Sequence, residues 1–359
     1  MTGIILPFGP PQGDGEDAQG DNIYTYDGWR AFVNRPVPTP PPAMTRALYE
    51  ALPREGRELY DETRRTYIMQ FGPINTPMLD VAKQVIKEQV DANVRAPLDQ
   101  VKTGVIIDGH ANLGKTTMVK AIARQFERSI RARTSFAGPE AEHLFIPVVH
   151  VTLQRDTTPK AMAQAICHYL HVPLRGRETE HQLVQAIHEA VRRHRILLFV
   201  VDDIHFLRVR SKSGQETSNF LKSLMSLTGA TFVYVGVGVE ELGILQEHGP
   251  TLATSQTASR FIHLPIPPFE KGSDAWTRLL RAVEGHLALL DQEPGTLEKH
   301  AALLFGRSGG SVGPLMNLLR KAALQAVGGQ ERIGAQALRQ ARMDYKSMMD
   351  GSLEEGGSE

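Results

Sequence analysis

The chain has very little cysteine, since Cys167 is the only one in 359 residues. It stands in an apolar stretch with no metal-ligating residues around it, so it cannot form an internal disulfide and we expect it to be a small buried hydrophobe. The sequence also lacks the run of about 18 apolar residues that a membrane span needs. These absences exclude a disulfide scaffold and a membrane protein, and they predict a protein of the reducing cytoplasm.

The chain also has a formal net charge of zero, because 40 Lys and Arg residues balance 40 Asp and Glu residues. Overall charge therefore neither favours nor excludes a nucleic-acid partner, and only local patches could indicate one. Hydrophobic residues make up 41% and charged residues 22% of the chain, as in ordinary globular proteins. A chain of this length holds one large domain or about two to three smaller ones.

The first 42 residues are rich in proline, glycine and acidic side chains, which predicts a disordered arm. Four aromatic residues interrupt this arm: Tyr24, Tyr26, Trp29 and Phe32. Aromatic side chains in such numbers also fit an arm that docks on the body of the protein or on a partner, and the sequence leaves both possibilities open. Residues 350–359 are polar and acidic, and they predict a disordered tail.

A phosphate-binding motif follows a short apolar run near residue 104. Its residues are Gly109, His110, Ala111, Asn112, Leu113, Gly114, Lys115 and Thr116, which fit the pattern G-x-x-x-x-G-K-[ST]. The glycines let backbone N–H groups close around phosphate oxygens, and the helix that begins here points its positive end at them. We expect Lys115 to reach the β- and γ-phosphates, Thr116 to ligate Mg²⁺, and Thr117 to lie in the same site. The motif therefore predicts ATP and Mg²⁺ as ligands.

Strands alternate with helices between residues 104 and 270. Apolar runs predict strands near 104 and at 146–153, 196–201, 231–237 and 262–267, and helical periodicity predicts helices at 115–133, 159–170, 180–193 and 217–227. This alternation indicates a parallel sheet covered by helices on both faces. In such a sheet a ligand binds at the carboxyl ends of the strands, where the phosphate-binding loop lies.

Helical patterns flank this block on both sides. Residues 43–103 predict an N-terminal helical segment, in which Thr76 and Pro77 open the strongest helix as its cap and its first helical residue. Residues 271–349 predict a small all-helical lid domain. The lid helices are expected at 275–290, 297–305, 312–327 and 334–349.

A second functional motif ends the strand expected at 196–201. The apolar run is followed directly by Asp202 and Asp203, the arrangement of a Walker B strand. We expect Asp202 to hold Mg²⁺, directly or through water, and Asp203 to orient the attacking water as a catalytic residue together with Lys115.

These motifs together resemble an AAA+ ATPase. The sequence has a P-loop, a Walker B strand that continues as Asp-Asp-Ile-His, a later Ser259-Arg260-Phe261 and a helical lid. The arrangement is most similar to the TniB/TnsC transposition-regulator family, which is related to the origin initiators. The resemblance covers roughly residues 76–327, and its ATPase motifs are more specific than its link to transposition. It implies a P-loop AAA+ fold, with a parallel sheet flanked by helices at 104–270, followed by the lid.

The resemblance also implies a role for Arg260. AAA+ proteins place an arginine finger just before the last strand of the sheet, and Arg260 stands there. Such a residue reaches the γ-phosphate bound by a neighbouring subunit and stabilises transition-state charge, so it implies a ring or filament of identical chains. A surface arginine in a salt bridge is the alternative.

Three departures from the family pattern predict slow hydrolysis. Asp203 replaces the usual glutamate and reaches about 1.5 Å less far, which can cost on the order of a hundredfold in rate. Val237 or Gly238 occupies the sensor-1 position, where a polar residue is usual. The sensor-2 arginine of the lid is missing, because Pro314 stands near its place and Arg307 and Arg320 have the wrong spacing.

Two polar segments are candidates for DNA contact. Arg208 and Arg210 follow the Walker B motif, and Thr158 and Lys160 follow the second strand. In the related transposition ATPases this region tracks a DNA backbone, and phosphate contact needs only such donors. Solvated loops are the alternative for both segments.

The leading interpretation is an ATPase that assembles on double-stranded DNA with ATP and recruits or activates a transposase. A replication initiator or loader is the first alternative, and an ATP-binding signalling scaffold is the second. A winged-helix domain would favour the initiator, and a repeat or effector domain would favour the scaffold. The sequence indicates neither kind of domain.

Overall fold

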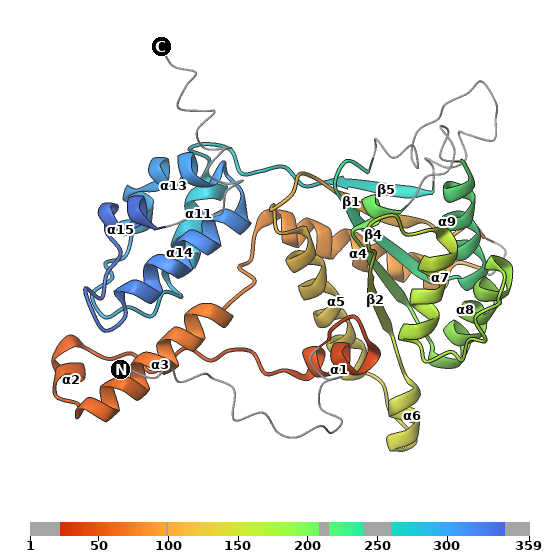
Figure 1. Ribbon diagram of the computed structural model, residues 1–359, viewed down its shortest axis with the longest axis horizontal. Helices are drawn as coiled ribbons and strands as arrows, with labels where there is room; N and C mark the ends of the chain where they lie inside the picture. The colour runs from red at the N-terminus through yellow and green to blue at the C-terminus, as the bar shows by residue number, and fades with distance from the viewer. Residues whose placement is uncertain (1–21, 98–99, 208–214, 240–259, 342–359) are drawn as a thin grey trace, which may run out of the picture.

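The computed structural model describes residues 22–97, 100–207, 215–239 and 260–341. Its centre is a parallel sheet of five strands in the order β2-β3-β4-β1-β5 (Figure 1). The strands are β1 Gly104–Asp108, β2 Val148–Thr152, β3 Leu198–Asp202, β4 Thr231–Gly236 and β5 Phe261–Pro265. Strands β1, β3 and β4 are buried throughout, which explains their almost uninterrupted apolar sequences. The predicted parallel sheet is confirmed.

Helices cover both faces of the sheet, as predicted. Helices α4 (Pro77–Arg95) and α5 (Lys115–Arg131) pack together on one face, and α7 (Pro159–Tyr169), α8 (Glu180–His194) and α9 (Gln215–Thr228) cover the other (Figure 1). The side chain of Thr76 caps α4 by accepting a hydrogen bond from Leu79 N at 3.2 Å. Short elements connect these layers, namely α6 (Pro139–Leu144) and the 3₁₀ turn η2 (Ile204–Phe206).

The aromatic part of the N-terminal arm is a helix, α1 (Tyr26–Asn34), which packs on α5. Trp29 is fully buried, and its ring stacks on His150 of β2 at 5.1 Å between centroids. Its Nε1 donates a hydrogen bond to Glu127 Oε2 of α5 at 2.8 Å. Of the two possibilities that the sequence leaves open for the aromatic segment, docking on the body is the one seen, and the disorder predicted for residues 1–42 does not hold for α1. Residues 1–21 and the predicted tail at 350–359 lie outside the described residues.

The lid has its own hydrophobic core, in which Trp276, Leu280, Leu304 and Leu319 are fully buried. Its helices are α11 (Asp274–Glu284), α12 (Thr296–Lys299), α13 (Ala301–Ser308), α14 (Val312–Ala326) and α15 (Ala335–Gln340). The helix predicted at 334–349 is seen as α15, and residues 342–349 lie outside the described part of the chain. None of the described helices has the length and apolar character needed to cross a membrane.

The N-terminal helical segment predicted at 43–103 is divided between the two cores. Helices α2 (Arg46–Glu50) and α3 (Arg54–Gln70) lie against the lid, whereas α4 packs on the sheet. Arg64 of α3 is fully buried and donates to both carboxylate oxygens of Glu331, at 2.5 and 2.9 Å. This correction concerns residues more than 200 positions apart, which no local pattern could have paired.

Candidate nucleotide-binding site

The P-loop has the backbone shape that phosphate binding requires. Asn112 and Gly114 adopt left-handed conformations, with φ of 66° and 86°. A Cβ atom at Gly109 would lie 2.4 Å from the carbonyl oxygen of Ile266, so only glycine fits there. Helix α5 begins at Lys115, and its first N–H groups face the loop. The loop is therefore a cradle for anionic oxygens at the carboxyl end of β1.

Lys115 points into this cradle. Its ammonium group donates to the carbonyl oxygens of Gly109 at 2.7 Å and His110 at 2.5 Å. Burial lowers the pKa of Lys115, and the negative charges of Asp108, Asp202 and Asp203 oppose that shift. Three carboxylates around a buried ammonium favour its charged form, which is the form that binds phosphate.

The two predicted magnesium ligands lie side by side. Asp202 is buried at the end of β3, and the Thr116 hydroxyl at the start of α5 donates a hydrogen bond to it. Burial raises the pKa of Asp202, the hydrogen bond from Thr116 opposes this shift, and the charge of Asp203 adds to it. A hydroxyl and one carboxylate fit Mg²⁺, which takes few protein oxygens and completes its shell with water and phosphate.

Asp203 stands directly beside this pair, at the turn from β3 into η2. Its backbone is left-handed, with φ of 56°, and its N–H donates to Asp202 Oδ1 at 3.0 Å. Its carboxylate accepts a hydrogen bond from Thr152 Oγ1 of β2 at 3.1 Å. Thr152 therefore orients Asp203, a contact that the sequence did not indicate because it crosses between strands.

Neither predicted sensor position supplies a polar side chain among the described residues. The chain leaves β4 as Gly236, Val237, Gly238 and Val239. In the lid, Arg307 donates to the carbonyl oxygens of Leu338 and Ala341, and Arg320 donates to that of Phe71 at 2.8 Å. Both arginines are thus bonded to backbone carbonyl oxygens outside the P-loop.

The lid nevertheless touches the P-loop through its backbone. Helix α14 begins beside the loop, and Gly313 N donates to Asn112 O at 3.0 Å. A Cβ atom at Gly313 would lie 2.8 Å from the same oxygen, so glycine permits this close approach.

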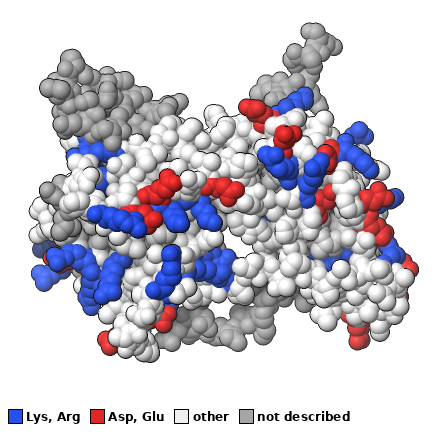
Figure 2. Space-filling view, turned by 180° about the vertical axis from the view of Figure 1, so that it is seen from behind, with Lys and Arg blue, Asp and Glu red and all other residues white. Residues whose placement is uncertain are grey.

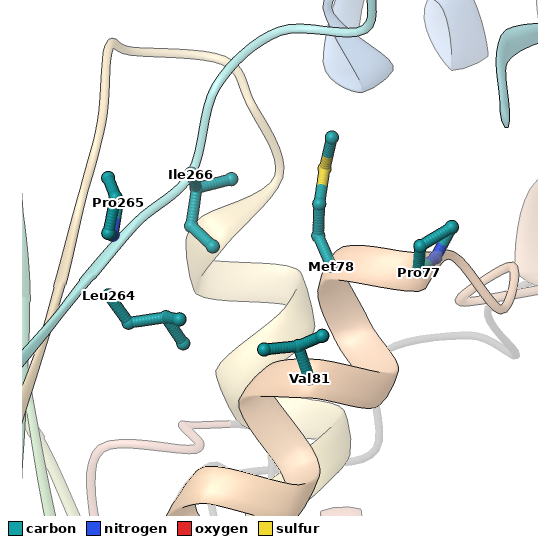
Figure 3. A pocket seen from close by; sticks show the side chains of 6 residues that line it. All are labelled: Pro77, Met78, Val81, Leu264, Pro265 and Ile266. Carbon is teal, nitrogen blue, oxygen red and sulfur yellow. The ribbon is translucent and has the colours of Figure 1, made fainter.

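A small apolar cavity of about 240 Å³ lies next to the P-loop (Figure 3). Pro77, Met78 and Val81 of α4 line one side, and Leu264, Pro265 and Ile266 at the end of β5 line the other. Ile266 ties this cavity to the loop, because its N–H donates to Asp108 O at 2.7 Å. The sequence does not reveal this cavity. Helical periodicity predicts the helix that begins at Pro77, but it does not show that β5 lies beside that helix.

Arg260 lies at the opposite end of the sheet from the P-loop of its own chain. Its carbonyl accepts a hydrogen bond from Gly104 N, at the start of β1, and the P-loop follows the end of that strand. Five residues of strand separate these positions by roughly 15 Å. The Arg260 side chain donates to Ser226 Oγ of α9 at 3.1 Å, on the surface. It is therefore placed away from its own nucleotide site.

Residues that precede the two candidate DNA segments, Thr157 and Leu207, lie side by side. Thr157 forms a parallel bridge with Leu207, and its N–H donates to Phe206 O at 3.1 Å. Thr158 caps α7 by accepting from Ala161 N at 3.1 Å, so its hydroxyl has a structural task. Lys160 lies in the first turn of the same helix. Arg208 and Arg210 lie outside the described residues.

Basic side chains also gather near the amino ends of the strands, where helices α5 and α8 end. Figure 2 shows the two charges interspersed over the lid, while blue side chains predominate over the lower part of the sheet domain. Helices α5 and α8 end with basic residues in their last turns: Arg128, Arg131, Arg192, Arg193 and His194. Cations at helix C-termini are favoured by the helix dipole, which accounts for these residues without a nucleic-acid partner.

Comparisons with known proteins agree with this geometry. Residues 99–244 match the family described as AAA domain. The Aeropyrum pernix ORC1 protein, solved in complex with DNA, is 17% identical with a TM-score of 0.53, over 77% of this chain and 68% of that one. The Aeropyrum pernix ORC2 protein, solved as ADPNP-ADP complexes, is 16% identical with a TM-score of 0.54, over 76% and 70%.

CDC6P from Pyrobaculum aerophilum is 16% identical with a TM-score of 0.53, over 76% of this chain and 68% of that one. No protein of curated function matches the sequence. At these identities the likeness establishes the fold, which is that of a P-loop AAA+ ATPase with a helical C-terminal part.

Proposed function

We propose that this chain is an ATP-dependent AAA+ regulator of DNA transposition. It oligomerises on double-stranded DNA with ATP, recruits or activates a transposase, and hydrolyses ATP slowly. The observation that carries the proposal is the pairing of a complete phosphate and magnesium site with Arg260 at the far end of the same sheet.

Each part of the site has a task in nucleotide binding. The N–H groups of the loop and the ammonium of Lys115 hold the phosphates. Thr116 and Asp202 hold Mg²⁺, which neutralises charge that develops on the phosphate oxygens during hydrolysis. The apolar cavity between α4 and β5 adjoins the loop through Ile266, and it suits the flat face of a nucleotide base.

Hydrolysis then depends on Asp203. Its carboxylate, oriented by Thr152, accepts a hydrogen bond from the water that attacks the γ-phosphate. The shorter side chain and the apolar end of β4 leave that water less well positioned, which supports slow turnover. ATP binding therefore acts mainly as an assembly switch.

The position of Arg260 supports action between subunits. An arginine that lies about 15 Å from its own P-loop can stabilise transition-state charge only on a nucleotide held by a neighbour. ATP at subunit interfaces then orders a ring or filament, and hydrolysis weakens it.

DNA contact is assigned to the basic residues that follow Leu207 in the sequence and to the residues that follow Thr157. Arg208, Arg210 and Lys160, with Thr158, supply cationic and hydroxyl donors to a DNA backbone. The ORC1 protein to which this fold is similar was solved in complex with DNA, which supports the same class of partner here. Backbone contacts of this kind predict binding with little sequence preference and strong dependence on salt.

The transposase partner separates this proposal from an initiator. An initiator selects particular DNA sequences, whereas a transposition regulator of this kind binds DNA broadly and increases strand transfer by a transposase from the same genome. Equal affinity for unrelated duplexes together with stimulated strand transfer supports the proposal. Tight binding to one sequence without stimulation contradicts it.

The first experiment compares the wild type with Asp203→Asn and Lys115→Ala in ATP binding, hydrolysis and electron microscopy with duplex DNA. We expect Asp203→Asn to bind ATP within about threefold of the wild type and to lose at least about tenfold in kcat. Its assemblies on DNA should persist longer, since hydrolysis weakens them. Lys115→Ala should not bind ATP, and it should not assemble unless ATP-bound copies of the chain are present beside it. A wild-type chain that remains monomeric with ATP and DNA would overturn the proposal.

A further inference from the structure

Asp108 is a buried carboxylate that the proposed function has not used. It is the last residue of β1, directly before Gly109 of the P-loop, and it is 8% exposed. Strand β1 lies between β4 and β5 in the sheet, so a side chain at its end can reach the chain that leaves either neighbour.

The Asp108 carboxylate bonds two different elements. Oδ1 accepts from Gly109 N at 2.7 Å, and Oδ2 accepts from Val239 N, in the chain that leaves β4, at 3.0 Å. His263 Nε2 of β5 lies 3.8 Å from Oδ2. Burying a carboxylate is costly unless its oxygens are bonded, so these two N–H groups hold Asp108 in one geometry.

The chain that leaves β4 touches both halves of the nucleotide site. A Cβ atom at Gly236 would lie 2.8 Å from Ile204 Cγ2, just after Asp203, so this turn packs closely on the Walker B side. Val239 is fully buried and is bonded to Asp108 on the P-loop side. Residues 236–239 carry no polar side chain, and beyond the ladder pairing of Gly236 with Asp108 this turn is bonded to the P-loop strand through Val239 N.

We propose that Asp108 is a positioning residue that couples the P-loop to the chain leaving β4, in place of the polar side chain that the end of β4 lacks. A shift of Gly109 on nucleotide binding moves Asp108, and Asp108 carries the shift to Val239. The inference rests on the proposed function.

Hydrogen exchange of peptides covering residues 235–239 measures this coupling directly. In the wild type, Mg²⁺ with a non-hydrolysable ATP analogue should slow exchange there by about tenfold or more. In Asp108→Asn the amide group meets two N–H donors and can accept from only one of them. At a concentration of the analogue that saturates it, that variant should lose the slowing.

Kinetics give a second readout that a purely structural role would not produce. With DNA present, Asp108→Asn should lower kcat about tenfold and leave the KM for ATP within about threefold. Asp108→Ser, which can reach Gly109 N but not Val239 N, should behave in the same way if the asparagine variant folds poorly. Asp61→Asn, at a buried aspartate of α3 that accepts from Tyr49 and Arg64, controls for the general cost of removing a buried charge.

The outcomes separate the two proposals. A wild type that binds no ATP would overturn the proposed function and the coupling with it. A wild type that binds ATP, together with an unchanged exchange response and kcat in both Asp108 variants, would overturn the coupling alone.

Discussion

His150 shows what a single residue contributes to this fold. It is fully buried in β2, where its ring lies between those of Trp29 at 5.1 Å and Tyr24 at 5.7 Å. Burial, helped by the positive charge of Lys120, lowers the pKa of His150 to about 3. The folded protein therefore holds this imidazole neutral, and α1 stays docked over it.

The first prediction follows from that shift. Below pH 6.5 the unfolded chain protonates His150 and the folded chain does not, so this residue makes stability fall as the pH drops from about 6.5 towards 3. Between about pH 7.5 and pH 5, the wild type should lose about 2 kcal/mol more unfolding free energy than His150→Phe. Urea unfolding at both pH values measures the difference. The exposed His181→Gln should respond to pH as the wild type does, and an identical response in His150→Phe would refute the assignment.

At the residue scale, the sequence indicates the motif positions but not their hydrogen-bond partners. Gly109 to Thr116 and Asp202 stand out in the sequence because phosphate chemistry fixes their types and spacing, and their binding roles stay predictions. The hydrogen bonds from Thr152 to Asp203 and from Val239 to Asp108 were not found, because each joins strands that only the sheet order brings together.

At the scale of elements, helix α3 is stabilised by its contacts with the lid. Arg64 is buried between Glu331, at 2.5 Å, and Asp61, also at 2.5 Å. Removing one partner of such a buried group leaves uncompensated charge, which typically costs about 3–5 kcal/mol. This contact lies in the lid core, which is distinct from the core of the sheet domain.

We therefore predict that Arg64→Ala destabilises the lid and leaves the sheet domain nearly unchanged. The two tryptophans allow a separate measurement, since Trp276 is in the lid core and Trp29 is in the sheet core. In a Trp29→Phe background the fluorescence of Trp276 should show a clearly lower urea midpoint, and in a Trp276→Phe background the signal of Trp29 should not move. Arg54→Ala, at an exposed pair with Glu58 on the same helix, should shift neither. Equal shifts of both signals would mean that α3 is shared between the cores.

Strands and long helices of this fold were predictable because apolar periodicity alone specifies them. Helix α1 was not, since nine residues form a helix mainly through packing and the flanking prolines and glycines favour an extended chain. The docking of α3 on the lid was also hidden, because periodicity gives the apolar face of a helix but not what covers it.

At the scale of the whole molecule, three described chain connections join the sheet domain to the lid with its helices α2 and α3. They are residues 35–45, the segment from Phe71 to Thr76 and the segment after Ile266, and the apolar cavity lies between the ends of the last two. Gly313 of the lid contacts Asn112 of the P-loop, so a nucleotide bound in that loop would lie beside the lid as well as the sheet. Arg260 lies at the amino ends of the strands, opposite the P-loop. The sheet thus has the nucleotide site at the carboxyl ends of its strands and Arg260 at their amino ends, and the proposed function depends on this arrangement.

A mixing experiment with Lys115→Ala and Arg260→Ala tests that claim most directly. Each variant alone should lose at least about 100-fold in DNA-stimulated ATP hydrolysis, since one lacks the phosphate lysine and the other the arginine of the neighbour. Mixed in equal amounts, they should recover up to about a quarter of the wild-type rate, because that share of interfaces pairs an intact P-loop with an intact Arg260. No recovery on mixing, from two variants that fold and join the same assemblies, would contradict the account.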